Sequence, residues 1–194
     1  MTTTQAEPTD ETAWDRITDI ARWLDEQSPV ADSMEALKMR VLKIGEEYGE
    51  ACEALLTPGP LNTPGLVTEL CDVILTASVA LFTADRASEQ LFSDALVWPA
   101  GFSEEPVSKL ILAIGQEYGR ACQALIGVTA YNPRKGASHT MADLVTNLGD
   151  LIRAAVVALD DVDQDAAATF AANLERVHNR SLGVTRLPDE APHS

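Results

Sequence analysis

The feature that most restricts the fold of this chain is an internal repeat. The segment "IGEEYGEACEALL" begins at Ile44 and returns as "IGQEYGRACQALI" from Ile114. A second segment, "LVTELCDVILTASVAL" from Leu66, returns as "LVTNLGDLIRAAVVAL" from Leu144, with ten of sixteen positions identical. Two unrelated amphipathic helices would share the spacing of apolar residues, but not the same glycines, tyrosine and threonine. We therefore interpret the chain as a tandem duplication of one helical unit.

Helical periodicity runs through both copies, and the alternation typical of strands is nearly absent. Thr140 and Asp143 have the spacing of a capping box, and Thr63 precedes a proline as an N-cap does. We expect an all-α fold in which the two copies pack as an intrachain pseudo-dimer, with a first unit at 1–98, a second at 99–180 and a disordered tail at 181–194. The apolar spacing predicts seven helices, at about 12–26, 37–55, 64–83, 87–97, 104–126, 141–159 and 163–179.

The charge of the chain excludes several classes of partner. The formal net charge is −16, with −12 in residues 1–98 and −4 in residues 99–194. Such a chain repels phosphate backbones and anionic lipids, so we expect neither a nucleic-acid nor a membrane partner. The N-terminus lacks the basic start and apolar run of a signal peptide, and we expect a cytoplasmic protein. The three cysteines show no disulfide or zinc spacing.

Carboxylates gather on two successive helices of the first copy. Glu47 and Glu50 are three residues apart, so they project from one face, and Glu69 and Asp72 repeat that spacing within an otherwise apolar segment. A short loop makes these helices antiparallel neighbours. Crowded carboxylates cost several kcal/mol unless a cation lies between them, and Mg²⁺ is the usual cation where phosphates also bind. A solvated helix face is the alternative interpretation of the first pair alone.

These acids form the pattern EExxE (Glu46, Glu47 and Glu50) followed by ExxD (Glu69 and Asp72) on the next helix. The pattern resembles the MazG-like all-α nucleoside triphosphate pyrophosphohydrolases, a superfamily related to the dimeric dUTPases. The resemblance covers about 37–81 and 110–159 and implies cleavage between the α and β phosphates with Mg²⁺, or with Mn²⁺ instead. It implies that Glu47, Glu50, Glu69 and Asp72 are the metal ligands. We interpret Glu46, beside them, as the general base.

The second copy keeps only part of this set. It retains two acids as Glu117 and Asp150, but Arg120 and Asn147 replace the other two. Two carboxylates facing an arginine make a poor Mg²⁺ site, so we expect an ion pair between Arg120 and Asp150 instead. Because a duplicated chain contains both helical units, the two units can pair within one chain. One copy then need not keep its own acids. The duplicated dimeric dUTPases also have unequal halves.

Basic residues of the second copy are candidates for substrate binding. Its longer inter-helix loop resembles the basic NPRKG loop of some actinobacterial MazG-like proteins, and Arg134 and Lys135 are candidates to hold a triphosphate. An ordinary exposed turn is the equal alternative. Asn179 and Arg180 are weaker candidates, since the helix dipole also favours basic residues near a C-terminus. We interpret Trp23 as a packing residue rather than one that stacks on a base.

The leading functional hypothesis is a Mg²⁺-dependent hydrolase that cleaves a nucleoside triphosphate to its monophosphate and pyrophosphate. The alternative is a non-catalytic helical protein that binds a nucleotide or a protein partner and keeps a relic metal site. A relic is expected to lose acids in both halves, whereas here one half keeps the full set. The sequence leaves open which nucleotide is bound and whether two whole chains form a homodimer.

Overall fold

The structure, a computed structural model, describes residues 11–28, 33–59, 64–99, 101 and 103–183. The described residues form seven α-helices and no strand, which confirms the predicted all-α class. Because each helix coincides with a segment of apolar periodicity, the elements arise where the sequence analysis expects them. The helices are α1 (Ala13–Gln27), α2 (Ser33–Leu56), α3 (Pro64–Ala84), α4 (Glu89–Ala95), α5 (Val107–Val128), α6 (Met141–Val162) and α7 (Ala166–Ser181).

The observed helix ends agree with some of the predicted caps and boundaries and differ from others. The capping box predicted at Thr140 is present: its hydroxyl accepts a bond of 3.2 Å from the Asp143 N–H, and the Asp143 carboxylate accepts one of 2.7 Å in return. α5 begins three residues later than expected, because Pro106 is its N-cap. α4 is shorter than predicted. The start of the tail was predicted too early, at residue 181, because Ser181 is still the last residue of α7. The predicted N-cap Thr63 and residues 184–194 lie outside the described residues.

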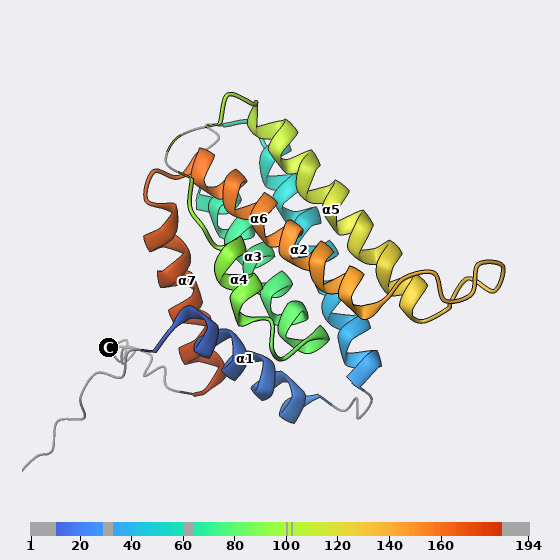
Figure 1. Cartoon of the computed structure of the whole chain (residues 1–194). Coiled ribbons are helices and arrows are strands. Elements are labelled where there is room, and N and C mark those ends of the chain that lie inside the picture. The colour runs from blue at the N-terminus through green and yellow to red at the C-terminus, as the bar shows by residue number, and fades with distance from the viewer. Residues whose placement is uncertain (1–10, 29–32, 60–63, 100, 102, 184–194) are drawn as a thin grey trace, which may run out of the picture.

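The helices of the two halves are interleaved around one core. α2 packs on α3 and α5 packs on α6, while α3 contacts α6 and α2 contacts α5 across the halves. α1 and α7, from the two ends of the chain, lie against each other (Figure 1). Buried apolar residues from all seven helices belong to a single cluster. Neither half therefore has a hydrophobic core of its own.

The contact between α2 and α5 explains the glycine and tyrosine that both copies carry. The ring of Tyr118 lies over Gly45, where an added Cβ would be 2.3 Å from the phenol oxygen. The ring of Tyr48 lies over Gly115 at the same distance. Each glycine thus makes room for the tyrosine of the other half, and the two contacts are reciprocal.

α3 is the central helix and the most apolar one. By length and composition alone it is long enough to cross a membrane, with a mean hydropathy of 1.8 over 18 residues, 67% of which are buried within the protein. This burial accounts for the apolar composition, because a helix covered on most sides has few solvated positions.

Candidate metal centre and adjoining cavity

Three of the predicted ligands meet between α2 and α3. One carboxylate oxygen from each of Glu47, Glu50 and Glu69 lies within 4.8 Å of the other two. The antiparallel packing of the two helices produces this group, since the end of α2 lies beside the start of α3. Glu47 is buried, Glu69 is half-buried and Glu50 is exposed, so the group opens to solvent on one side.

The electrostatics of this group favour a cation. Burial, together with the negative charges of Glu50, Asp72 and Glu47, raises the pKa of Glu69 to about 7. Burial also raises the pKa of Glu47, although Lys43 opposes that shift. The neighbouring negative charges disfavour the ionisation of Glu47 and Glu69, and a divalent ion would relieve this repulsion. The donor set is oxygen only, and it fits a hard cation such as Mg²⁺.

Asp72, the fourth predicted ligand, lies beside the group rather than within it. It is half-buried, and its charge contributes to the raised pKa values of both Glu69 and Glu47. Its Oδ1 accepts a hydrogen bond of 2.9 Å from Nδ2 of Asn173 on α7. A helix of the second half thus contacts a predicted ligand of the first.

Lys43 supplies the positive charge nearest to these acids. Its Nζ lies 2.7 Å from Oε1 of Glu47 and 3.0 Å from Oε2 of Glu46. Burial works against the charged form, but the two carboxylates prevail and raise the pKa of Lys43. Glu46, the predicted general base, is exposed and lies outside the group formed by Glu47, Glu50 and Glu69.

A cavity of about 380 Å³ adjoins the acids and is enclosed by α1, α2, α3 and α7. Glu47 and Asp72 line its wall, so the cavity and the candidate metal centre share residues. Trp23, interpreted from the sequence as a packing residue, also lines it. The rest of the lining consists of an apolar set (Ile20, Leu24, Leu75, Val79 and Val177), a basic set (Arg40, Lys43, Arg176 and Arg180) and two hydroxyl side chains (Thr76 and Ser181).

The basic residues of the cavity differ in how they are held. Arg40 bonds to the Asp25 carboxylate at 2.7 Å, to the Ala21 carbonyl at 3.0 Å and to the Thr83 hydroxyl. These contacts make it a structural link between α1, α2 and α3. The Arg180 guanidinium forms no hydrogen bond or ion pair with a described residue. It is therefore free to meet an anion that enters the cavity.

The remaining predicted substrate-binding residues lie elsewhere. Arg134 and Lys135 are exposed on the loop between α5 and α6, which projects from the side of the bundle opposite α7 (Figure 1). Lys135 lines a separate cavity of about 300 Å³ formed with the end of α5. Asn179 is half-buried on α7 and does not line the cavity next to the acids. Of the four candidates, the structure brings only Arg180 to that cavity.

In the second half, three of the four positions equivalent to the predicted ligands contact one another. The predicted pair between Arg120 and Asp150 is wrong: Arg120 Nη1 lies 2.9 Å and 3.1 Å from the two carboxylate oxygens of Glu117. The two residues are three apart on one helix, so they are immediate neighbours. Nδ2 of Asn147 donates to the Arg120 carbonyl at 3.3 Å, and Asp150 is exposed.

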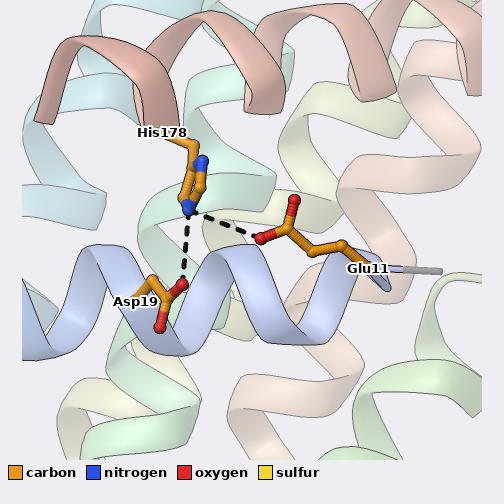
Figure 2. A group of neighbouring side chains, drawn as sticks. All are labelled: Glu11, Asp19 and His178. Carbon is orange, nitrogen blue, oxygen red and sulfur yellow. Dashed lines mark hydrogen bonds and ion pairs between the residues drawn. The ribbon is translucent and has the colours of Figure 1, made fainter. Parts of the chain in front are cut away.

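A second group of ligand-type side chains joins α7 to the start of α1. Nε2 of the buried His178 points toward two carboxylates, at 3.4 Å from Oδ2 of Asp19 and 3.9 Å from Oε1 of Glu11 (Figure 2). Each carboxylate also has an arginine partner, Arg22 for Asp19 and Arg16 for Glu11. We interpret the group as a polar contact that holds together two helices of the cavity wall.

Sequence reasoning missed the contribution of α1 to this site and, apart from Arg180, that of α7. Asn173 and Arg176 carry no motif, and they lie about a hundred residues from the acids that they approach. Only the chain topology, which places the last helix beside α3, brings them there. The chain matches no known protein-family model, no curated protein and no solved structure. Its function therefore has to be inferred from the geometry of this site.

Proposed function

We propose that the chain is a Mg²⁺-dependent nucleotide pyrophosphohydrolase, a duplicated MazG-like unit that converts a nucleoside triphosphate to its monophosphate and pyrophosphate. One observation carries the proposal. Glu47 belongs both to a group of three carboxylates and to the wall of a cavity that carries basic and apolar side chains. A bound nucleotide needs all three kinds of contact: oxygen ligands for its metal ion, cationic side chains for its phosphates and an apolar wall for its base.

The acids of the first half would hold the metal. Glu47, Glu50 and Glu69 already lie together, and the charge of Asp72 raises the pKa values of Glu47 and Glu69. When bound, Mg²⁺ supplies positive charge for the phosphate oxygens and lowers the pKa of a coordinated water. Glu46 remains the proposed general base, with Lys43 Nζ 3.0 Å from its carboxylate.

The cavity would hold the rest of the nucleotide. The Arg180 and Arg176 guanidinium groups can form charge-assisted hydrogen bonds to phosphate, and Lys43 can contribute a third positive charge. Trp23 and Leu24 offer an apolar surface for the base. The phosphate contacts proposed here come from α2 and α7, in place of the loop that carries Arg134 and Lys135.

The test is a screen of nucleoside triphosphates with Mg²⁺ in which pyrophosphate and monophosphate are both measured. Asp72→Ala is expected to abolish the metal-dependent release of pyrophosphate while circular dichroism shows an unchanged helix content. The matched control is Asp150→Ala, which removes the equivalent acid of the second half and is expected to keep activity. Equal loss in both variants, or release of orthophosphate only, would refute the proposal.

One observation favours the alternative, a non-catalytic nucleotide-binding protein. The ammonium group of Lys43 already lies 2.7 Å from Glu47, and it can neutralise part of the acidic group without a metal. On that alternative, calorimetry would detect nucleotide binding of equal strength with Mg²⁺ and with a chelator, and no product would form. The enzymatic proposal predicts that the chelator weakens binding and stops turnover.

A further inference from the structure

The contact between Asp72 and Asn173 joins residues that are 101 positions apart in the chain. Asp72 lies on α3 of the first half, and Asn173 lies on α7 of the second. Both side chains are half-buried, and Nδ2 of Asn173 donates to Oδ1 of Asp72 at 2.9 Å. One lone pair of that oxygen and both lone pairs of Oδ2 remain available to a cation.

Arg176 determines which end of the Asn173 amide faces Asp72. Its guanidinium donates to Oδ1 of Asn173, one turn earlier on α7. A guanidinium has donors only, so the amide must present its oxygen to Arg176 and its NH₂ group to Asp72. The amide therefore has one orientation, and it restricts the rotation of the Asp72 carboxylate.

The second half has no equivalent of this support. The repeat places Phe92 and Phe170 at matching positions, so Asn173 corresponds to Ala95 and Arg176 to Trp98. Ala95 is buried, and the ring of Trp98 packs at 6.2 Å from that of Phe170. Ala95, at the position of Asn173, has no side-chain donor and cannot replace the amide. The acids that remain in the second half thus also lack an amide that would orient Asp150, since the equivalent position is Ala95.

We propose that Asn173, oriented by Arg176, is a positioning residue for the metal ligand Asp72. A helix of the second half then completes the metal centre of the first, which gives the duplication a direct role in the site. The inference rests on the proposed function, because it requires that Asp72 bind the ion. Partners that orient metal ligands by hydrogen bonds typically contribute about 10–100-fold to affinity or activity.

The test is a Mn²⁺ titration of the full chain, with free Mn²⁺ measured by electron paramagnetic resonance. Asn173→Leu keeps the size of the side chain but removes the donor, and its Mn²⁺ affinity is expected to fall about tenfold or more. Asn147→Leu is the matched control, since Asn147 donates only to a backbone carbonyl in the second half, and it should leave the affinity unchanged. Thermal unfolding of Asn173→Leu with a chelator checks that the fold is intact.

Arg176 provides a second, independent variant. Arg176→Met removes a positive charge near the site, which by itself would strengthen cation binding. Weaker Mn²⁺ binding in this variant, restored in Arg176→Lys, would therefore report lost positioning and not a charge effect. Unchanged Mn²⁺ affinity in Asn173→Leu, or tighter Mn²⁺ binding in Arg176→Met, would overturn the inference. Mn²⁺ binding by the wild-type chain would in that case still support the metal centre itself. Failure of the wild-type chain to bind Mn²⁺ would instead overturn the proposed function, and this inference with it.

Discussion

The reciprocal packing of glycine and tyrosine between α2 and α5 offers a quantitative test of how the two halves associate. We consider Gly45→Ala, which places one methyl group against the Tyr118 ring. The added Cβ would be 2.3 Å from the phenol oxygen and 2.7 Å from Cζ, whereas ordinary contacts lie at 3.4–4 Å. The ring must therefore move by about 1 Å, within a core of native packing density.

The expected magnitude follows from two opposing terms. Overpacking of this kind costs about 1–3 kcal/mol. Alanine is also favoured over glycine inside a helix by about 1 kcal/mol, which hides part of that cost. Gly49 lies four residues later in the same helix, and an added Cβ there meets no atom within 4 Å. Gly49→Ala therefore gains the propensity term alone, so the difference between the two variants isolates the clash.

Urea denaturation followed by circular dichroism measures both variants. Gly49→Ala should unfold at a higher urea concentration than the wild type, and Gly45→Ala should be about 1–3 kcal/mol less stable than Gly49→Ala. Gly115→Ala and Gly119→Ala repeat the pair in the second half, where Gly115 faces Tyr48 and Gly119 faces open space. Equal stability within either pair would show that the halves do not pack as described.

Two further predictions concern charge. Burial and the acids around Glu69 raise its pKa to about 7, above the value of 4.5 for an unperturbed glutamate. The contribution of Glu69 to the stability of the metal-free fold is therefore fully present below pH 4.5 and is lost as the pH rises through 7. Mn²⁺ affinity should accordingly rise by up to about tenfold per pH unit and level off above pH 7. Glu69→Gln should reduce the dependence of unfolding on pH in this range, and the raised pKa of Glu47 accounts for the part that remains. An unchanged pH profile in that variant would contradict the assignment. For phosphate binding, Arg180→Ala should raise KM about tenfold or more. The double variant Arg134→Ala/Lys135→Ala should keep wild-type kinetics. The reverse result would show that the loop, and not α7, binds the phosphates.

Local sequence signals predicted the elements of this fold well, because the information is short-range. Apolar spacing located all seven helices, and the Thr140 capping box is present as expected. The errors lie at helix ends, as at Pro106, where one residue decides between cap and helix. The reciprocal contact of Gly45 with Tyr118 could not be predicted, since it depends on how α2 crosses α5.

The candidate site was predictable only where its residues share a helix or a hairpin. Glu47, Glu50 and Glu69 meet because a short connection makes α2 and α3 neighbours, and that follows from the sequence. Arg120 was assigned the wrong partner, because the nearer acid on its own helix competes for it. Asn173 was missed because nothing in a single sequence shows which helix α7 will contact.

The basic side chains that balance the acids of the first half lie on a different element from the one that the sequence indicated. The loop of the second half carries Arg134 and Lys135, the candidates to hold a triphosphate, but it projects from the side of the bundle opposite α7 (Figure 1). Balance comes instead from α7, where Arg176 and Arg180 line the same cavity as Glu47 and Asp72. The last helix of the chain thus approaches the proposed metal ligands Glu47 and Asp72. In the proposed enzyme, the loss of acids from the second copy is tolerable, because that copy contributes to the site through α7.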